Sequence, residues 1–162
     1  MSEQDAFNSL VGDLDYPMFI VTTSVDGERA GCLVGFATQT SIHPSRFLVC
    51  LSHLNRTYRL GRGAEYLAVH WVPADAGDLA DLFGGQTGDE IDKFAHCAWH
   101  EGPGGVPIVE RCPNWFVGRV VRRVDAGDHE GFLLEPVAAH RGAAAGEFTF
   151  HRAKGIEAGH PA

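Results

Sequence analysis

The sequence predicts one domain, built mainly of antiparallel β-strands that close into a small barrel flanked by a few short α-helices. Short runs rich in β-branched and aromatic residues recur along the chain and are separated by turn signals such as Asp26-Gly27 and Ala126-Gly127-Asp128. The strand–helix alternation of a parallel sheet does not occur. No G-x-G-x-x-G motif follows a predicted strand and no GK[ST] occurs, which argues against a Rossmann or P-loop nucleotide site.

The predicted elements begin with a helix over residues 4–14, where apolar side chains recur at helical spacing. Pro17 then opens a β-rich run, and Asp26-Gly27 indicates a tight hairpin because glycine accepts a positive φ. Asp75 is expected to cap a later helix, and the tail after Lys154 to fray. The further strands are expected at 29–36, 47–52, 65–72, 114–124, 129–140 and 147–152, and the further helices at 57–61, 75–83 and 89–94.

The composition narrows the kinds of function that this protein can have. The formal net charge is -8 with acidic residues spread along the chain, which argues against nucleic acid as the main partner. No apolar run is long enough to cross a bilayer, and the first residues lack the pattern of a secretory signal. We therefore predict a cytoplasmic protein that does not bind membranes. The cysteines, which form no CxxC pair, are expected to be free thiols: Cys32, Cys50, Cys97 and Cys112.

The segment 52–57 (Ser-His-Leu-Asn-Arg-Thr) is the first candidate site. It places hydroxyl, amide and guanidinium donors immediately before a predicted short helix, where a phosphate group could bind. Arg56 could add a bidentate charge-assisted bond to such a phosphate. The alternative is that Ser52 or Asn55 only caps the helix.

Two further polar features could contact a planar ligand. The stretch Ala37–Ser41 offers consecutive hydroxyl and amide groups for the heteroatom edge of a ring, or it is a solvent-facing strand end. His129 follows the turn Gly127-Asp128, where an imidazole could donate a proton or bind a carboxamide, or could simply be exposed. His96 and His100 have the i, i+4 spacing of metal ligands, but the intervening Trp99 and the glycine-rich segment that follows disfavour a continuous helix. We predict no metal site.

Taken in order, these segments resemble the flavin reductase-like, FMN-binding split-barrel family over roughly residues 10–140. The resemblance rests on PMFIVTTSVDGERAG, then ATQTSIHP, then FLVCLSHLNRT, and continues through DLADLFGG, DKF and WHEGPGGVPIVE to VGRVVRRVDAGDHEGFLLEPV. It implies a six-stranded antiparallel Greek-key split barrel that forms a homodimer with flavin near the interface. It also implies hydride transfer from NAD(P)H to FMN, with FAD as an alternative, and a monooxygenase as a partner protein.

The resemblance also implies residue roles. Thr38, Gln39 and Ser41 match positions that contact the isoalloxazine ring, and His129 matches a histidine beside the nicotinamide or flavin. Ser52, Asn55, Arg56 and Thr57 match the phosphate loop.

The chain departs from the family pattern at Leu33, Val34 and Phe36, where small polar residues are common, and at His43-Pro44-Ser45. These departures make the pocket over the flavin more apolar and leave the second substrate open. Two alternatives therefore stand beside a flavin reductase. One is a non-catalytic flavin-binding or electron-relay protein, and the other is a split-barrel protein that holds a deazaflavin or haem.

Overall fold

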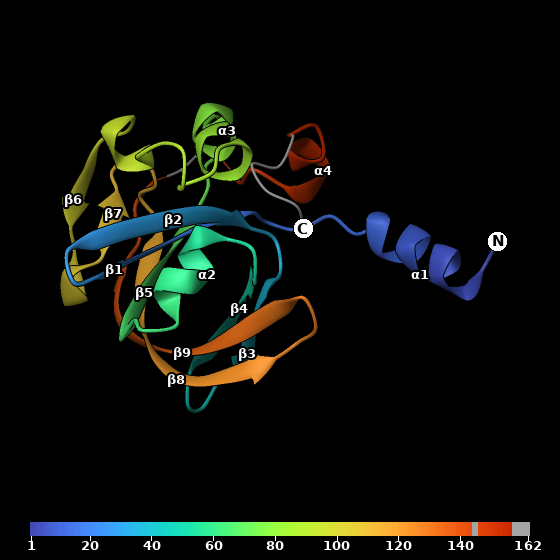
Figure 1. The fold of residues 1–162 in the computed structure, drawn as a ribbon, viewed down its shortest axis with the longest axis horizontal. Coiled ribbons are helices and arrows are strands. Elements are labelled where there is room, and N and C mark those ends of the chain that lie inside the picture. Colours follow the sequence, from blue (N-terminus) through green and yellow to red (C-terminus); the bar gives the residue numbers. More distant parts are fainter. Residues whose placement is uncertain (144–145, 157–162) are drawn as a thin grey trace.

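A computed structural model describes residues 1–143 and 146–156 (Figure 1). The strands are β1 (Phe19–Val25), β2 (Glu28–Val34), β3 (Ala37–Ser41), β4 (Arg46–Ser52), β5 (Tyr66–Trp71), β6 (Trp99–Glu101), β7 (Pro107–Val109), β8 (Trp115–Asp125) and β9 (His129–His140). The helices are α1 (Glu3–Gly12), α2 (Arg56–Gly61), α3 (Gly77–Gly85) and α4 (Phe150–Ala153), with 3₁₀ turns η1 (Lys93–Ala95) and η2 (Pro103–Gly105).

Seven strands form one antiparallel sheet in the order β2-β1-β5-β8-β9-β4-β3, and β6 pairs with β7 in a separate hairpin. The sheet curls on itself, so that β2 and β4 approach each other around α2 (Figure 1). The Cys50 N–H donates to the Phe36 carbonyl at 2.8 Å and ties the β2–β3 connection to β4. The predicted antiparallel barrel with short helices is confirmed. It has seven main strands where six were expected, because the polar stretch Ala37–Ser41 pairs with β4 as a strand of its own.

The hairpin that joins β1 and β2 forms as the sequence predicts. Asp26 has φ 52° and Gly27 has φ 81°, so both central residues take the left-handed conformation of a two-residue turn. The pairing Val25↔Glu28 then fixes the register of both strands. Alternate side chains of β1 enter different cores, since Ile20 packs with α3 whereas Val21 lies inside the barrel.

Three expectations about the later segments are wrong. Residues 89–94 do not form a helix, because the Asp92 carboxylate accepts the Phe94 N–H and begins the 3₁₀ turn η1 instead. The expected edge strand at 147–152 is reduced to two isolated bridges, and the chain then turns into α4. Helix α3 begins at Gly77 after Ala76, so Asp75 is not its cap. The glycine-rich loop between residues 101 and 107 lies within the unpredicted β6–β7 hairpin.

His70 joins three strands inside the protein. Its Nε2 accepts the Val109 N–H at 3.0 Å, so the proton of the neutral ring lies on Nδ1 and is donated to the Ile20 carbonyl at 2.8 Å. The side chain is completely buried, and burial lowers its pKa to about 4. The neutral imidazole therefore holds β1, β5 and β7 together.

The two ends of the described chain differ. Helix α1 has a Ser2 capping box but no buried residue, and it extends away from the barrel (Figure 1). The C-terminal segment instead packs on the barrel: Phe148 is buried, and the Phe150 N–H donates to the Tyr16 carbonyl at 2.9 Å. Ile156 also packs against this core, so fraying does not begin at 154. The rest of the expected frayed tail, residues 157–162, lies outside the described residues.

None of the helices in the described ranges is long and apolar enough to cross a membrane. All four cysteines are free thiols, as predicted. Cys32 and Cys112 are buried, and Cys50 and Cys97 are partly buried.

Candidate functional site

The segment between β4 and α2 is held by local hydrogen bonds. Asn55 caps α2, since its Oδ1 accepts the Thr57 N–H at 2.8 Å. The Ser52 hydroxyl accepts the Leu54 N–H at 3.3 Å. The capping interpretation of Asn55 is therefore confirmed, and any ligand role of this side chain comes in addition to it.

An apolar pocket of about 270 Å³ opens where β2 and β4 end. It is lined by Leu33, Val34 and Cys50, and also by Ser52 and Asn55. It is also lined by side chains far apart in the sequence, which are Tyr16, Met18, Phe36, His129, Phe150 and Ile156. The structure thus brings three of the predicted site residues, Ser52, Asn55 and His129, to one cavity.

Two aromatic pairs line the apolar pocket. The rings of Phe36 and His129 have centroids 5.0 Å apart at 53°, and the rings of Tyr16 and Phe150 stack at 4.7 Å and 10°. Gly35 lies next to the second pair, and a Cβ there would come within 2.9 Å of the Tyr16 ring. Flat aromatic surfaces with apolar neighbours suit a planar ring system.

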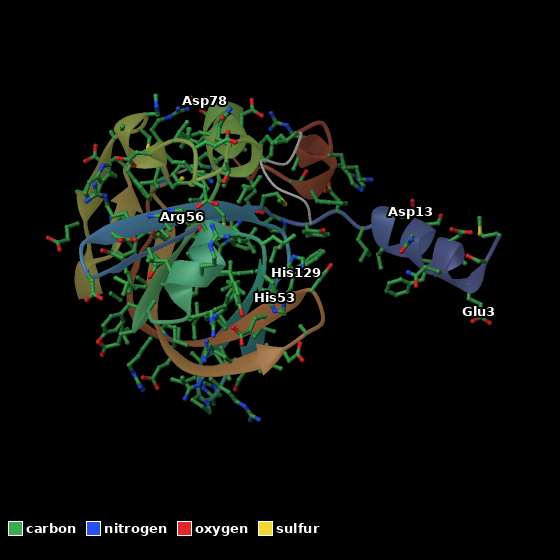
Figure 2. The ribbon with its side chains drawn as sticks, in the orientation of Figure 1. Glu3, Asp13, His53, Arg56, Asp78 and His129 are labelled. Atoms are coloured by element: carbon green, nitrogen blue, oxygen red, sulfur yellow. The ribbon has the colours of Figure 1, made fainter. Side chains whose placement is uncertain are left out.

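His129 is held in place by the residue before it. Its Nδ1 lies 2.7 Å from Asp128 Oδ1, and this hydrogen bond lowers the pKa of the Asp128 carboxyl group. A carboxylate can only accept, so Nδ1 carries a proton and Nε2 is left for a ligand. The Asp128 carbonyl also accepts the His53 N–H at 3.0 Å, which joins this turn to the segment before α2 (Figure 2).

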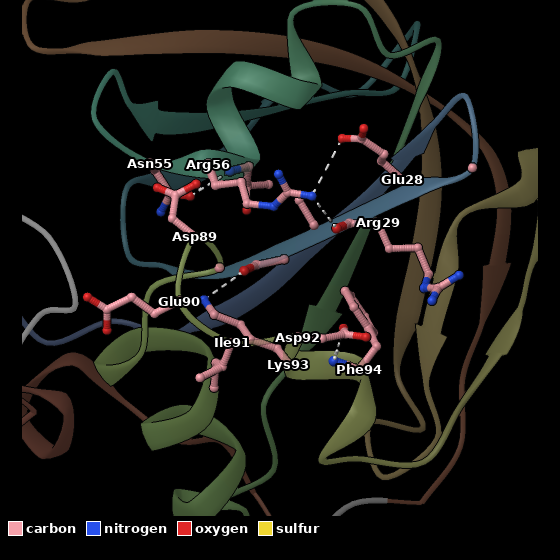
Figure 3. Close-up of a pocket in the computed structure, with 15 residues that line it drawn as sticks. Glu28, Arg29, Asn55, Arg56, Asp89, Glu90, Ile91, Asp92, Lys93 and Phe94 are labelled. Atoms are coloured by element: carbon pink, nitrogen blue, oxygen red, sulfur yellow. Dashed lines mark hydrogen bonds and ion pairs between the residues drawn. The ribbon is translucent and has the colours of Figure 1, made fainter.

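A polar pocket of about 390 Å³ lies beside α2 (Figure 3). Arg56 projects into it, and its Nη2 lies 3.4 Å from the Arg29 carbonyl and 3.6 Å from Glu28 Oε2. The pocket also contains carboxylates, but Asp89 pairs with Arg59 at 2.5 Å and Asp92 caps η1. Among the described residues, Arg56 thus makes one long hydrogen bond and one long ion pair, and its charge also acts on Asp89.

A small cationic recess of about 30 Å³ adjoins both pockets. It shares Leu33, Asn55 and Gly84 with the apolar pocket, and Asn55, Arg56, Gly88 and Lys93 with the polar pocket. The described residues that line it include two cations and no carboxylate. A ligand could therefore extend from an apolar slot into a positively charged end.

Two buried groups lie next to this recess. The Thr57 Oγ1 atom is buried and has no hydrogen-bond partner in the described part of the chain. Lys93 is also buried, and its burial lowers the pKa of its ammonium group. Burial raises the pKa of the Cys32 thiol, although Lys93, Thr57 and Asn55 nearby oppose that rise. Thr57 and Lys93 therefore place two buried polar side chains beside the recess.

Thr38, Gln39 and Ser41 lie apart from these cavities. They belong to β3, the edge strand of the sheet, where Thr38 and Gln39 are exposed. Gln39 lines a different groove with Phe47 and Trp71. Within a single chain these residues do not join the residues around Asn55, and their proposed contact with a ring stays a prediction.

The histidine pair considered for a metal is also separated. His100 lies on β6 and approaches Glu110 at 3.5 Å, whereas His96 follows η1. Among residues 1–143 and 146–156, no three His, Cys, Asp or Glu side chains are grouped as metal ligands.

Sequence reasoning missed Lys93 and the aromatic wall of Tyr16 and Phe150. Each comes to the site from a segment that has no site motif of its own. A lysine next to phenylalanine in DKF was a signal available in the sequence, but its burial depends on contacts 62 and 10 residues away, with Gly31 and Phe83.

Comparisons with known proteins identify the family. Residues 11–156 match the flavin reductase like domain. The FMN reductase (NADH) RutF of Ancylobacter novellus is 29% identical over 159 residues, which cover 98% of this chain and 87% of that protein.

Solved structures share the fold. A flavin reductase domain protein from Arthrobacter sp. FB24 superposes with a TM-score of 0.83 at 20% identity, covering 92% of this chain and 91% of that one. A homologue of nitrilotriacetate monooxygenase component B from Mycobacterium thermoresistibile gives a TM-score of 0.76 at 22% identity, covering 85% and 75%. The chain therefore belongs to the flavin reductase like domain family.

Proposed function

We propose that this protein is an NADH-dependent flavin reductase that uses FMN. The observation that carries the proposal is that the apolar pocket and the cationic recess adjoin at Leu33, Asn55 and Gly84, because FMN has a planar ring at one end and a phosphate at the other. Family membership and the relative named FMN reductase (NADH) support the same reaction.

The residues present fit FMN by their chemistry. Arg56, Asn55 and the buried Thr57 hydroxyl offer donors for a phosphate, as the sequence predicts, and Ser52 lines the apolar pocket. The aromatic and aliphatic lining of the apolar pocket suits the isoalloxazine ring. When bound, the flavin supplies the acceptor for a hydride from NADH.

His129 is the proposed catalytic residue. Asp128 fixes its Nδ1, so that Nε2 can donate to or accept from the nicotinamide or the flavin edge. Phe36 packs against the same imidazole and limits its rotation. The protein's part in the reaction is thus to orient the two reactants and to exclude water from the space between them.

The experiment that tests this function uses the purified full chain. FMN is titrated by the quenching of its fluorescence, and NADH consumption is then followed with and without FMN. We expect NADH oxidation that requires flavin. Tight FMN binding without NADH oxidation would instead support an electron-relay protein, and failure to bind any flavin would contradict the proposal.

We further propose a homodimer. Helix α1 presents the exposed apolar side chains Phe7 and Leu10, and Leu14 follows just after it; no described part of the chain covers them. A second copy would cover this face and could bring β3, with Thr38, Gln39 and Ser41, toward the partner's ring site. Light scattering should give twice the chain mass, and the double variant Phe7→Ser/Leu10→Ser should give the mass of one chain.

We place the enzyme in the cytoplasm, where free thiols persist and NADH is supplied. A monooxygenase that consumes reduced flavin is the proposed partner, supported by the fold shared with a monooxygenase component B homologue. Co-purification of a tagged chain from its own cells tests both statements.

A further inference from the structure

Lys93 is a buried cation with an unusual set of contacts. Its side chain Nζ donates to the Phe83 carbonyl at 2.8 Å and to the Gly31 carbonyl at 2.9 Å. An ammonium group has three protons, so these bonds leave one of them for another acceptor. Lys93 also lines both the polar pocket and the cationic recess (Figure 3).

Its charge has no carboxylate partner. None of the ion pairs formed among residues 1–143 and 146–156 includes Lys93. Of the acidic residues of the adjoining polar pocket, Asp89 is paired with Arg59, Glu28 faces Arg56, Asp92 caps η1, and Glu90 forms no ion pair with Lys93. Buried charges are normally paired, so a cation in this position favours an anionic ligand.

The surrounding structure fixes where that cation lies. Gly31 has no side chain, and a Cβ there would come within 2.7 Å of the Phe83 ring, so α3 can approach β2 closely. The two carbonyls that hold Lys93 come from these same two elements, Gly31 on β2 and Phe83 on α3. The ammonium group is thus preorganised before any ligand arrives.

Arg56 faces the same recess from the opposite side. It comes from α2, whereas Lys93 is the first residue of η1, and both line the recess together with Asn55. We propose that Lys93 binds the flavin phosphate and supplies, with Arg56, the second positive charge of a two-cation phosphate clamp. This inference rests on the proposed function, and it assigns a ligand contact to a residue outside the 52–57 segment.

The test compares FMN with riboflavin, which has the same ring but no phosphate. Lys93→Met keeps an apolar stem of similar length and removes the charge. We expect it to weaken FMN binding by about 10- to 100-fold, the range for a charge-assisted hydrogen bond, and riboflavin binding by less than about twofold. Arg122→Met removes an exposed positive charge on β8 that lines none of these cavities, and it should leave both affinities within about twofold of the wild type.

Equal losses for FMN and riboflavin in Lys93→Met would overturn the inference and make Lys93 a purely structural tie between β2 and α3. If Lys93→Met does not fold, Lys93→Gln, which can still donate to one carbonyl, is titrated in the same way, and a wild-type ratio of the two affinities overturns the inference. Wild-type protein that binds riboflavin and FMN equally would overturn it as well. Wild-type protein that binds neither would contradict the proposed function itself.

Discussion

The apolar pocket and the cationic recess meet at Leu33, Asn55 and Gly84, yet they are built in different ways. The apolar pocket is assembled from both ends of the chain and from strand ends, and it recognises shape. The recess is lined by two cations from separate segments and recognises charge. Because each cavity suits one half of FMN, a change in one should be distinguishable from a change in the other by the ligands it affects.

The largest expected effect is a loss of folding stability at acid pH, which is caused by His70. It affects both cavities together. Its pKa is about 4 in the folded protein and 6.5 in the unfolded chain, so the unfolded state binds a proton first as the pH falls. The free energy of unfolding should decrease from about pH 6.5 down to about pH 4 and then level off for this group. The difference of 2.5 pKa units corresponds to about 3 kcal/mol.

Urea unfolding at several pH values measures this decrease. His70→Gln should be less stable at neutral pH and should lack this part of the pH dependence. A wild-type stability that stays constant across this range would contradict the assignment of a buried neutral imidazole.

The next effect separates catalysis from binding inside the apolar pocket. His129→Ala should slow the reduction of bound FMN by NADH by on the order of a hundredfold if the imidazole acts as a general acid or base, and by less if it only positions the reactants. Anaerobic stopped-flow absorbance measures this step directly. FMN affinity should change little.

Asp128→Asn is the matched control for His129, because it keeps an oxygen acceptor for Nδ1 and removes the negative charge of the carboxylate. We expect an intermediate loss of rate. Reduction at the wild-type rate in His129→Ala would remove the catalytic role, and simultaneous loss of FMN binding would make the residue structural.

A substitution at Arg56 tests whether the recess binds the phosphate of FMN. Arg56→Ala should weaken FMN binding by about 1.5–3 kcal/mol, the range for a hydrogen bond to a charged group, and should hardly affect riboflavin. Isothermal titration with both ligands measures the two affinities. If riboflavin binding weakens as much as FMN binding, Arg56 instead stabilises the fold through its contacts with Glu28 and the Arg29 carbonyl.

The smallest effect tests the aromatic wall. Phe150→Ala removes the ring that stacks on Tyr16, and we expect FMN and riboflavin to weaken equally, by about 1 kcal/mol. Val121→Ala on β8 is the control, because this exposed side chain lines neither cavity, and it should leave both affinities unchanged. A loss of affinity confined to FMN would contradict the division of the site into a shape-selective pocket and a charge-selective recess.

Local signals predicted much of this molecule. Asp26-Gly27 fixed a hairpin because its backbone conformation is set by those two residues alone, and Asn55 marked the start of α2 for the same reason. The 52–57 segment was found because its donors are adjacent in the sequence. In each case the information lies within a few residues.

The missed features depend on distant contacts. From its sequence alone the DKF segment is predicted to be helical, and only the contacts of Lys93 with Gly31 and Phe83 show otherwise. Residues 147–152 are likewise predicted to form a strand, and only the stacking of Phe150 on Tyr16 shows otherwise. Burying a charge or stacking two rings outweighs the local preference of a short segment. No property of residues 147–156 alone indicates that they form a wall of the apolar pocket.

The attachment of α1 has a thermodynamic consequence. The end of this helix and the residues after it are hydrogen-bonded to the C-terminal segment. Lys154 Nζ donates to the Gly12 carbonyl at 2.7 Å, and the His151 N–H donates to Asp15 at 3.0 Å. Helix α4 in turn lines the apolar pocket through Phe150 and Ala153. Any molecule that stabilises one orientation of α1 through these bonds also biases the wall that a flavin ring would touch. Thermodynamic linkage makes such an effect reciprocal. If that molecule changes the affinity of the protein for flavin by some factor, flavin changes the affinity of the protein for that molecule by the same factor.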